Sequence, residues 1–246
     1  MKRTLIIGDT HGALRALKQL FERAKVSKND TLIFLGDYVD GWSESAQLIE
    51  YLIKLDTQQN CIFIRGNHDI WCENWLRTGD VDESWLFNGG LTTLDSYKNI
   101  NGTTRLRHLH FFEKMKYYEV DKMNRLYIHA GYTSIHGPQH EMYPSNYCWD
   151  RTLWEMAVVM DKRIDKDSIL FPKRLLHFGE IYIGHTPTLN YDVDTPMHAC
   201  NVWNIDTGSA FMGKLSMIDA DTKKIWQSDP VISLYPGEAG RNRFTN

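Results

Sequence analysis

Short apolar segments recur along the chain, and each has about the length of a buried β-strand. Five of them cover Thr4–Ile7, Thr31–Leu35, Cys61–Ile64, Leu126–Ile128 and Ile181–Ile183. Between the first three, apolar residues recur at helical spacing over 14–24 and again over 48–53, with Ser43 as a candidate N-cap. This alternation predicts β-α-β units, which require parallel pairing and right-handed crossovers.

The alternation stops between Ile70 and about Lys116, where tryptophans, polar residues and glycines predominate. We predict helices and loops over the carboxyl edge of the sheet, serving either as a lid or as more of the core. Beyond this segment the pattern predicts a helix over Thr152–Arg163. It also predicts strands over Lys116–Val120, Arg125–Ile128, Val202–Ile205, Ala210–Ile218 and Lys224–Ser228.

We interpret the last three of these strands as a meander that forms a second sheet, with turns at Asp206–Gly208 and Asp219–Asp221 between them. The fold class is therefore α/β (α+β). We expect one domain over residues 1–235, interrupted by an insertion over 70–116, and a loose polar tail over 236–246.

Composition is that of an ordinary globular protein, with 42% hydrophobic and 24% charged residues and a net charge of −3. This charge, with no run of Lys or Arg, argues against nucleic acid as a partner, although it is compatible with a local basic cleft. No apolar run approaches the ~20 residues that a membrane span needs, and the N-terminal run is too short for a signal peptide. Four scattered cysteines without a CxxC pair favour reduced thiols. We therefore expect a cytoplasmic protein without a membrane partner.

Each of the five apolar runs ends beside glycine at residues that bind metals or transfer protons. These residues are Asp9, His11, Asp37, Asp40, Asn67, His68, His129 and His185. Ligand sites form beyond the carboxyl ends of parallel strands, so the five ends can share one crevice. A single histidine or Asp-Gly pair is more often structural, but its repetition after all five runs predicts a site for two divalent cations.

The spacing supports shared coordination. Asp9 and His11 are two residues apart and point the same way in extended backbone, so both can reach one ion. Asp37 follows the neighbouring strand, and its two carboxylate oxygens can bridge two ions. A set of nitrogen and oxygen ligands without thiolate favours manganese, iron or zinc.

These motifs, in this order, resemble the blocks of the calcineurin-like metallophosphoesterases. Segments 36–40 and 65–69 are most similar to the phosphoprotein phosphatase branch, with bacterial and phage serine/threonine phosphatases as the nearest relatives, and segment 204–208 is similar to that group's C-terminal block. The resemblance implies a two-sheet β-sandwich flanked by helices. It also implies a metal-bridging hydroxide that attacks phosphorus in line.

The resemblance also implies a role for each residue. Two divalent metals, most readily manganese in vitro, would be held by Asp9, His11, Asp37, Asn67, His129 and His185. His68 would be the general acid and Asp40 would orient it, because a neighbouring carboxylate favours the charged imidazole. Arg151 would bind the phosphate, since arginine pairs bidentately with phosphate oxygens.

One position departs from the family pattern: Gly41 stands where a second phosphate-binding arginine is expected. Three explanations remain open. Another basic side chain fills the gap, with Arg77, Lys98 and Lys114 as candidates; or Trp42 stacks on an aromatic part of the substrate; or the activity is weak. Plain packing of Trp42 in the core is the alternative to stacking.

Three functions follow from these observations. The first is a phosphomonoesterase of the serine/threonine protein phosphatase type, acting on a phosphorylated protein or small phosphoester. The second is a hydrolase of dinucleoside polyphosphates or other nucleotide phosphoesters, which the Gly41 departure supports. The third is a binding module that retains the fold without the chemistry, and the complete ligand set argues against it.

Overall fold

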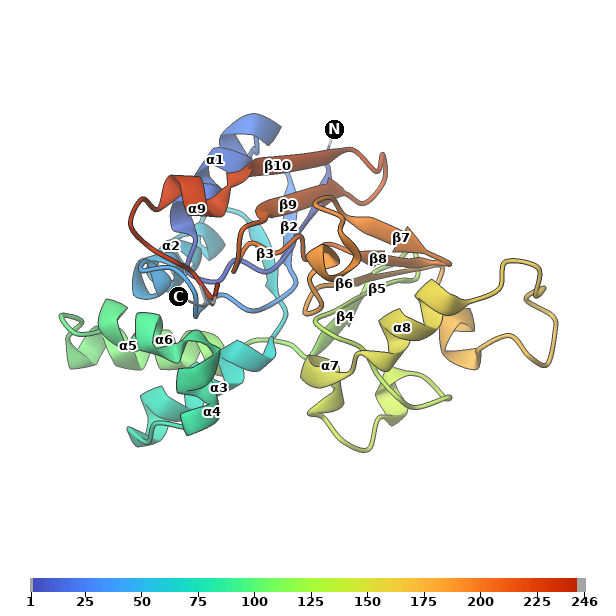
Figure 1. Cartoon of the computed structure of the whole chain (residues 1–246), viewed down its shortest axis with the longest axis horizontal. Coiled ribbons are helices and arrows are strands. Elements are labelled where there is room, and N and C mark those ends of the chain that lie inside the picture. Colours follow the sequence, from blue (N-terminus) through green and yellow to red (C-terminus); the bar gives the residue numbers. More distant parts are fainter. Residues whose placement is uncertain (1, 243–246) are drawn as a thin grey trace.

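Two five-stranded β-sheets form the centre of the computed structural model, which describes residues 2–242 (Figure 1). The first sheet has the order β10-β9-β1-β2-β3. The strands β1, β2 and β3 pair in parallel, which confirms the predicted β-α-β units, and β9 and β10 add antiparallel strands beside β1. Their bounds are β1 Thr4–Ile7, β2 Thr31–Phe34, β3 Asn60–Phe63, β9 Lys214–Asp219 and β10 Ile225–Pro230.

The second sheet has the order β4-β5-β6-β8-β7. Its three inner strands β5, β6 and β8 run parallel, and β4 and β7 pair antiparallel at the edges. The bounds are β4 Tyr118–Val120, β5 Arg125–Ile128, β6 Glu180–Ile183, β7 Met197–Ala199 and β8 Val202–Asn204.

The predicted C-terminal meander is wrong. Strand β8 belongs to the second sheet, whereas β9 and β10 belong to the first, where Ile6 of β1 faces Ile218 of β9. Turn residues mark where a strand ends but carry no information about which sheet the next strand joins. The turn at Asp206–Gly208 therefore carries the chain from one sheet to the other.

Helices α1 (Leu14–Ala24) and α2 (Ser45–Asp56) pack against the first sheet. Ser43 is not the N-cap of α2, because that position is Glu44 and the Ser43 hydroxyl donates to Glu238. The second sheet is flanked by α7 (Asn146–Trp149) and α8 (Thr152–Val159). Helix α8 ends earlier than predicted because the backbone turns extended at Met160, before the charged turn.

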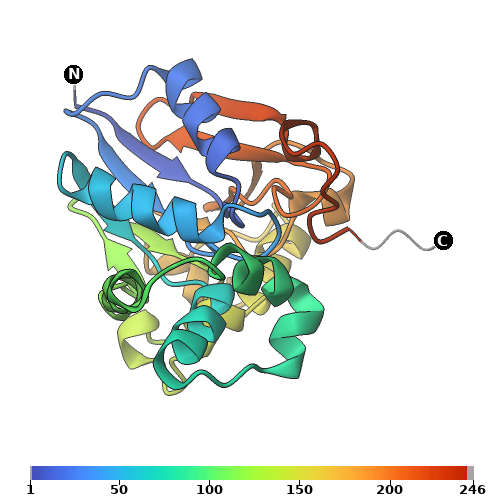
Figure 2. The ribbon, with the colours of Figure 1, turned by 90° about the vertical axis from the view of Figure 1, so that its left-hand side faces the viewer.

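Segment 70–116 is mainly helical and lies at the lower left of Figure 1. Figure 2 shows the same helices gathered below α2. The elements are α3 (Asn67–Thr78), α4 (Glu83–Trp85), a π-helical turn (Leu86–Gly90), α5 (Leu91–Ser96) and α6 (Gly102–Glu113). Shorter elements complete the fold, namely 3-10 turns at Pro138–His140, Lys173–Leu176 and Thr188–Tyr191, and α9 at Val231–Leu234.

The core has three apolar layers that follow from the alternation of side chains along each strand. In β1, Leu5 and Ile7 face the helices, whereas Ile6 faces the second sheet and packs with Tyr127 and Tyr182. Face-to-face packing brings the carboxyl ends of strands from both sheets to one edge. Within residues 2–242 no helix is long and apolar enough to cross a membrane. The cytoplasmic location stays a prediction.

Candidate metal centre

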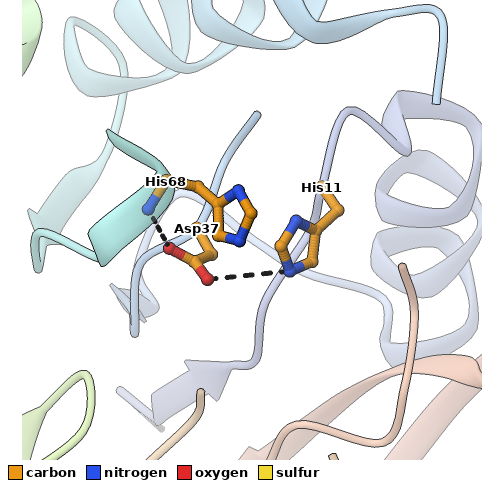
Figure 3. A group of neighbouring side chains, drawn as sticks. All are labelled: His11, Asp37 and His68. Carbon is orange, nitrogen blue, oxygen red and sulfur yellow. Dashed lines mark hydrogen bonds and ion pairs between the residues drawn. The ribbon is translucent and has the colours of Figure 1, made fainter. Parts of the chain in front are cut away.

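The loops that follow the parallel strands bring two groups of donor atoms together around Asp37. One group consists of His11, Asp37 and His68, and the other of Asp37, His129 and His185; in each, the donor atoms lie within 4.8 Å of one another. In Figure 3 the Asp37 carboxylate lies beside the rings of His11 and His68, and dashed lines join it to His11 Nε2 and to the backbone nitrogen of His68. Asp37 belongs to both groups, so its carboxylate is within reach of both candidate ion positions.

The backbone at these positions is strained. His11, Asp37, Asp40 and His185 have φ values of 46°, 53°, 71° and 67°, a region that non-glycine residues rarely occupy. Such conformations cost about 1–3 kcal/mol each and concentrate at functional sites. Their occurrence at four predicted site residues supports a role beyond packing.

Asp69, to which the sequence assigned no role, holds this loop in place. Its carboxylate accepts hydrogen bonds from the backbone N–H groups of Asp37 (2.8 Å), Tyr38 (2.9 Å) and Gly66 (2.8 Å). Gly66 also clears space for Asp37, because a Cβ there would lie 2.1 Å from Asp37 Oδ1. The signal was an acidic residue at the third position of a helix, which caps the helix N-terminus.

Backbone carbonyls orient two of the histidines. His129 Nδ1 lies 2.8 Å from the Leu35 carbonyl, and His11 Nδ1 lies 2.9 Å from the Val39 carbonyl. Each Nδ1 therefore donates a proton to a backbone carbonyl, and Nε2 is the ring nitrogen that remains to face a metal ion or a second proton. The Nε2 atoms lie 3.4 Å and 3.7 Å from Asp37 Oδ2, respectively. This is the arrangement in which proteins prepare histidine for a metal.

Asn67 and Asp9 complete the predicted set in different ways. Asn67 Oδ1 lies 3.1 Å from His129 Nε2 and 3.0 Å from His185 Nδ1, among the second donor group. Within residues 2–242, Asp9 belongs to neither group of three. Its Oδ2 accepts from the His185 N–H, and its buried Oδ1 has no hydrogen-bond partner in that part of the chain. A buried carboxylate oxygen without a partner is costly unless a cation neutralises it.

Sequence analysis assigned no site role to Asp206, although it placed this residue in a turn and in the segment 204–208 that resembles the family's C-terminal block. Its side chain is buried and lines a cavity together with His11, Asp37 and His68. Burial and the charge of Asp37 raise its pKa to about 6, although the Gly208 N–H opposes this. An acidic residue immediately after a buried segment was the available signal.

The charges show that the residues suit a cation. Burial raises the pKa of Asp9 well above its usual value and lowers that of His11 to about 3. Burial also opposes protonation of His129, but the Asp37 carboxylate outweighs it and raises the pKa of His129 to about 10. Without metal, a proton on His129 therefore offsets negative charge that divalent cations would neutralise. The donor set and the unpartnered oxygen of Asp9 both fit such ions.

His68 and Asp40 form a fully buried pair beside this centre. His68 Nδ1 lies 2.6 Å from Asp40 Oδ2. The Asp40 carboxylate also accepts from Trp85 Nε1 (2.7 Å) and Thr93 Oγ1 (2.5 Å), two insertion residues that sequence analysis did not connect with the site. The position of Asp40 is thus restrained from three sides, so it can orient the imidazole.

A cavity opens over the centre and contains Arg151, whose Nε lies 3.4 Å from His185 Nε2. Two indole rings form part of its lining. Trp71 packs edge-to-face on His68 at 5.1 Å, and Trp149 packs edge-to-face on Trp71 at 5.0 Å. Trp149 remains 42% exposed.

The structure bears on two of the three explanations for Gly41. Trp42 does not reach the cavity: it is fully buried, stacks on Tyr235 at 5.2 Å and donates from Nε1 to the Ser209 carbonyl at 2.8 Å. The three basic candidates were also wrong, because Arg77, Lys98 and Lys114 lie outside the cavity lining. A basic side chain that sequence analysis missed, Arg241, lines it instead.

A phosphoester hydrolase built on two metal-ligand groups is the class that this fold and site define. A family model described as calcineurin-like phosphoesterase matches residues 2–193, and the chain belongs to this family. The resemblance stated from the sequence is therefore confirmed.

One curated relative and two solved structures are similar to this chain. An asymmetrical bis(5′-nucleosyl)-tetraphosphatase of Oceanobacillus iheyensis is 26% identical over 231 residues, which cover 86% of each chain. A protein serine/threonine phosphatase of Saccharomyces cerevisiae has a TM-score of 0.58 at 15% identity, covering 93% of this chain and 80% of that one. A metallophosphoesterase of Sphaerobacter thermophilus has a TM-score of 0.57 at 16% identity, covering 95% and 91%. These two structures bear on the fold alone, and they confirm the predicted two-sheet architecture.

Proposed function

We propose that this protein is a dinuclear-metal hydrolase of bis(5′-nucleosyl) polyphosphates, which cleaves them asymmetrically. The observation that carries the substrate class is the exposed Trp149, packed on Trp71 beside His68. A general acid lies on the side of the leaving group, so the two indoles lie where a nucleobase attached to that group can stack. Stacking of a base on an aromatic side chain contributes about 1–3 kcal/mol. The activity of the Oceanobacillus relative supports the same class.

The metal ligands in this proposal are Asp9, His11, Asp37, Asn67, His129 and His185, with Asp37 shared between the ions. Divalent cations bound there, for which we propose manganese in vitro, would stabilise charge at phosphorus and lower the pKa of water towards neutrality. Asp206 lines the same cavity, and the negative charge of its carboxylate favours the binding of cations there.

The remaining chemistry belongs to three side chains. His68 donates a proton to the leaving oxygen, and Asp40 keeps its Nδ1 turned inward so that Nε2 faces the cavity. Arg151 binds non-bridging phosphate oxygens, for which its fork of donors is suited. The buried indole of Trp85 and the hydroxyl of Thr93 hold Asp40 without reaching the substrate.

A phosphomonoesterase acting on phosphoproteins is the second candidate. The motif blocks at 36–40 and 65–69, which are most similar to the phosphoprotein phosphatase branch, favour it. An alkoxide leaving group needs a proton more than a phosphate does, and the His68–Asp40 pair suits that need.

A substrate panel with added manganese separates the candidates. We expect kcat/KM for diadenosine tetraphosphate to exceed that for a phosphoserine peptide, with ATP and AMP as products by anion-exchange chromatography. The Trp149→Ala variant should lose about tenfold in kcat/KM for the dinucleotide and little for the peptide. Met123→Ala, which removes an exposed apolar side chain outside the cavity, is the control. A preference for the peptide, unaffected by Trp149→Ala, would favour the second candidate.

A further inference from the structure

Arg241 enters the cavity from the C-terminal segment, part of the stretch that the sequence analysis expected to be a loose tail. Residues 236–242 of that stretch make defined contacts, and 243–246 lie outside the described residues. The Arg241 N–H donates to the Ala210 carbonyl at 2.8 Å. Glu238 accepts from the Ser43 backbone at 3.0 Å and from its hydroxyl at 2.7 Å. The segment is therefore attached to the loop that follows β2.

The absence of side chains at two glycines makes room for the Arg241 side chain. A Cβ on Gly89 would lie 3.2 Å from Arg241 Cγ, and a Cβ on Gly41 would lie 3.8 Å from the same atom. Gly41 has a φ of +137°, and its Cβ would lie 3.0 Å from the His11 carbonyl oxygen. The backbone at position 41 is thus unsuited to an arginine, while the side chain of Arg241 passes directly beside it.

The guanidinium of Arg241 has donors to spare. It lies 3.4 Å from Asn88 Oδ1 and over the ring of Phe211 at 5.3 Å. Among the described residues it forms no ion pair with a carboxylate, in contrast to Arg125, which pairs with Asp121 and Asp221. Arg151 likewise forms no such pair within the described chain. The two arginines that line the cavity are therefore free to bind an anion.

The negative charges of Asp37, Asp40 and Asp206 favour the charged form of Arg241. Balancing these charges is therefore an alternative reason for an arginine at this place. However, none of them pairs with it directly, and its side chain reaches the cavity lining beside Asp37 and Asp206. A guanidinium that only balanced these carboxylates would be expected to bind one of them. Arg241 instead lines the cavity over the donor groups, with its guanidinium beside Asn88 and Phe211.

We infer that Arg241 is a phosphate-binding residue that replaces the arginine missing at position 41. It contacts non-bridging phosphate oxygens from the side of Asn88 and Gly41, whereas Arg151 lies beside His185. This assignment rests on the proposed phosphoester hydrolysis, because it requires a phosphate over the metal centre. The C-terminal segment thereby becomes part of the substrate site, although it is far from the other site residues in sequence.

The test uses inorganic phosphate as the probe and the full-length protein loaded with manganese. Calorimetry gives the phosphate dissociation constant, and competition against p-nitrophenyl phosphate gives its inhibition constant. We expect Arg241→Ala to weaken phosphate binding about 10- to 100-fold, because this variant loses a charge-assisted hydrogen bond to the phosphate. The phosphate affinity of Arg241→Lys should lie between those of the wild type and Arg241→Ala, since a lysine keeps the charge without the bidentate fork. Added guanidinium should partly restore turnover in Arg241→Ala.

Control variants distinguish a wrong role for Arg241 from a wrong proposed function. Arg163→Ala removes an exposed arginine whose one ion pair among residues 2–242 is with Asp161, and this variant should bind phosphate like the wild type. Bound manganese, measured by elemental analysis, should be equal in all variants. Wild-type phosphate affinity in both Arg241 variants, with Arg151→Ala impaired, would overturn the role of Arg241 and leave the proposed function standing. Absence of phosphate binding in the manganese-loaded wild type would overturn both. If Arg241→Ala fails to fold, the lysine variant decides alone.

Discussion

At the level of single residues, the contacts of His68 fit two different roles. Its Nδ1 is held by Asp40, which suits a general acid, but its ring also belongs to the donor group of His11 and Asp37. A general acid and a metal ligand have different consequences when removed. Asparagine at this position keeps a polar side chain of similar size and can separate the two roles.

We predict that His68→Asn lowers kcat by about 10²- to 10⁴-fold on a phosphoserine peptide, because general acid catalysis contributes that much. The loss should be smaller with p-nitrophenyl phosphate, whose leaving group needs less help from a proton. Elemental analysis should find nearly unchanged metal. His110→Asn, which alters an exposed histidine on α6, is the control. Loss of one metal in His68→Asn would instead make His68 a ligand.

Individual elements are joined by polar contacts at their ends as well as by apolar faces. The carboxylate of Asp30, just before β2, accepts from Arg3 Nη2 at 2.6 Å and from the Ser27 N–H at 2.8 Å. Arg3 precedes β1, so this pair fixes the starts of two neighbouring parallel strands. Burial would raise the pKa of Asp30, but the hydrogen bonds from Arg3 and Ser27 outweigh burial and lower it to about 2.

We predict that Asp30→Asn lowers the free energy of unfolding by about 1 kcal/mol at pH 7, after allowance for screening by solvent. The depressed pKa makes this contribution fully present above the unfolded value of 3.8 and lost as pH falls towards 2. Urea unfolding of both proteins between pH 7 and pH 2.5 measures the difference. A difference that stays constant with pH would show that the carboxylate charge is not its source. Asp229→Asn, at a more exposed ion pair with Arg23, should have a smaller effect.

The metal centre joins the two halves of the whole molecule. Asp37 and Asn67 follow strands of the first sheet, whereas His129 and His185 follow strands of the second. A cation bound to all four, as proposed, would hold the sheets together at this edge. Because the four residues converge only in the folded chain, such a cation would stabilise that chain by mass action.

We therefore predict that manganese at about 100 times its dissociation constant adds about 2.7 kcal/mol to the free energy of unfolding, and that EDTA removes this gain. The gain should diminish as pH falls from 8 to 6. Asp37 raises the pKa of His129 to about 10, so a proton competes with the metal for Nε2 and does so more strongly at low pH. Thermal unfolding with and without manganese at each pH measures both effects. The Asp37→Asn variant should not respond, and a wild type indifferent to manganese would contradict the prediction.

Much of the fold and site follows from the sequence because both depend on regular, local patterns. Apolar runs and helical spacing sufficed for the parallel strands β1, β2 and β3, and ligand-type residues at strand ends sufficed for the candidate site. Parallel strands place their carboxyl ends together whatever the loops do, so the convergence of Asp37 with His11, His129 and His185 could be expected.

What only the tertiary structure decided depends on contacts between distant segments. No local pattern shows that β9 pairs with β1 instead of following β8, that Trp42 packs on Tyr235, or that Asp69 restrains the loop of Asp37. The same holds for Arg241: its polar surroundings in the chain are typical of a solvated tail, and the space beside Gly41 and Gly89 exists only after folding. The sequence alone thus determined which chemical groups meet at the ends of the strands, and the packing of remote segments decided which side chains complete the site around them.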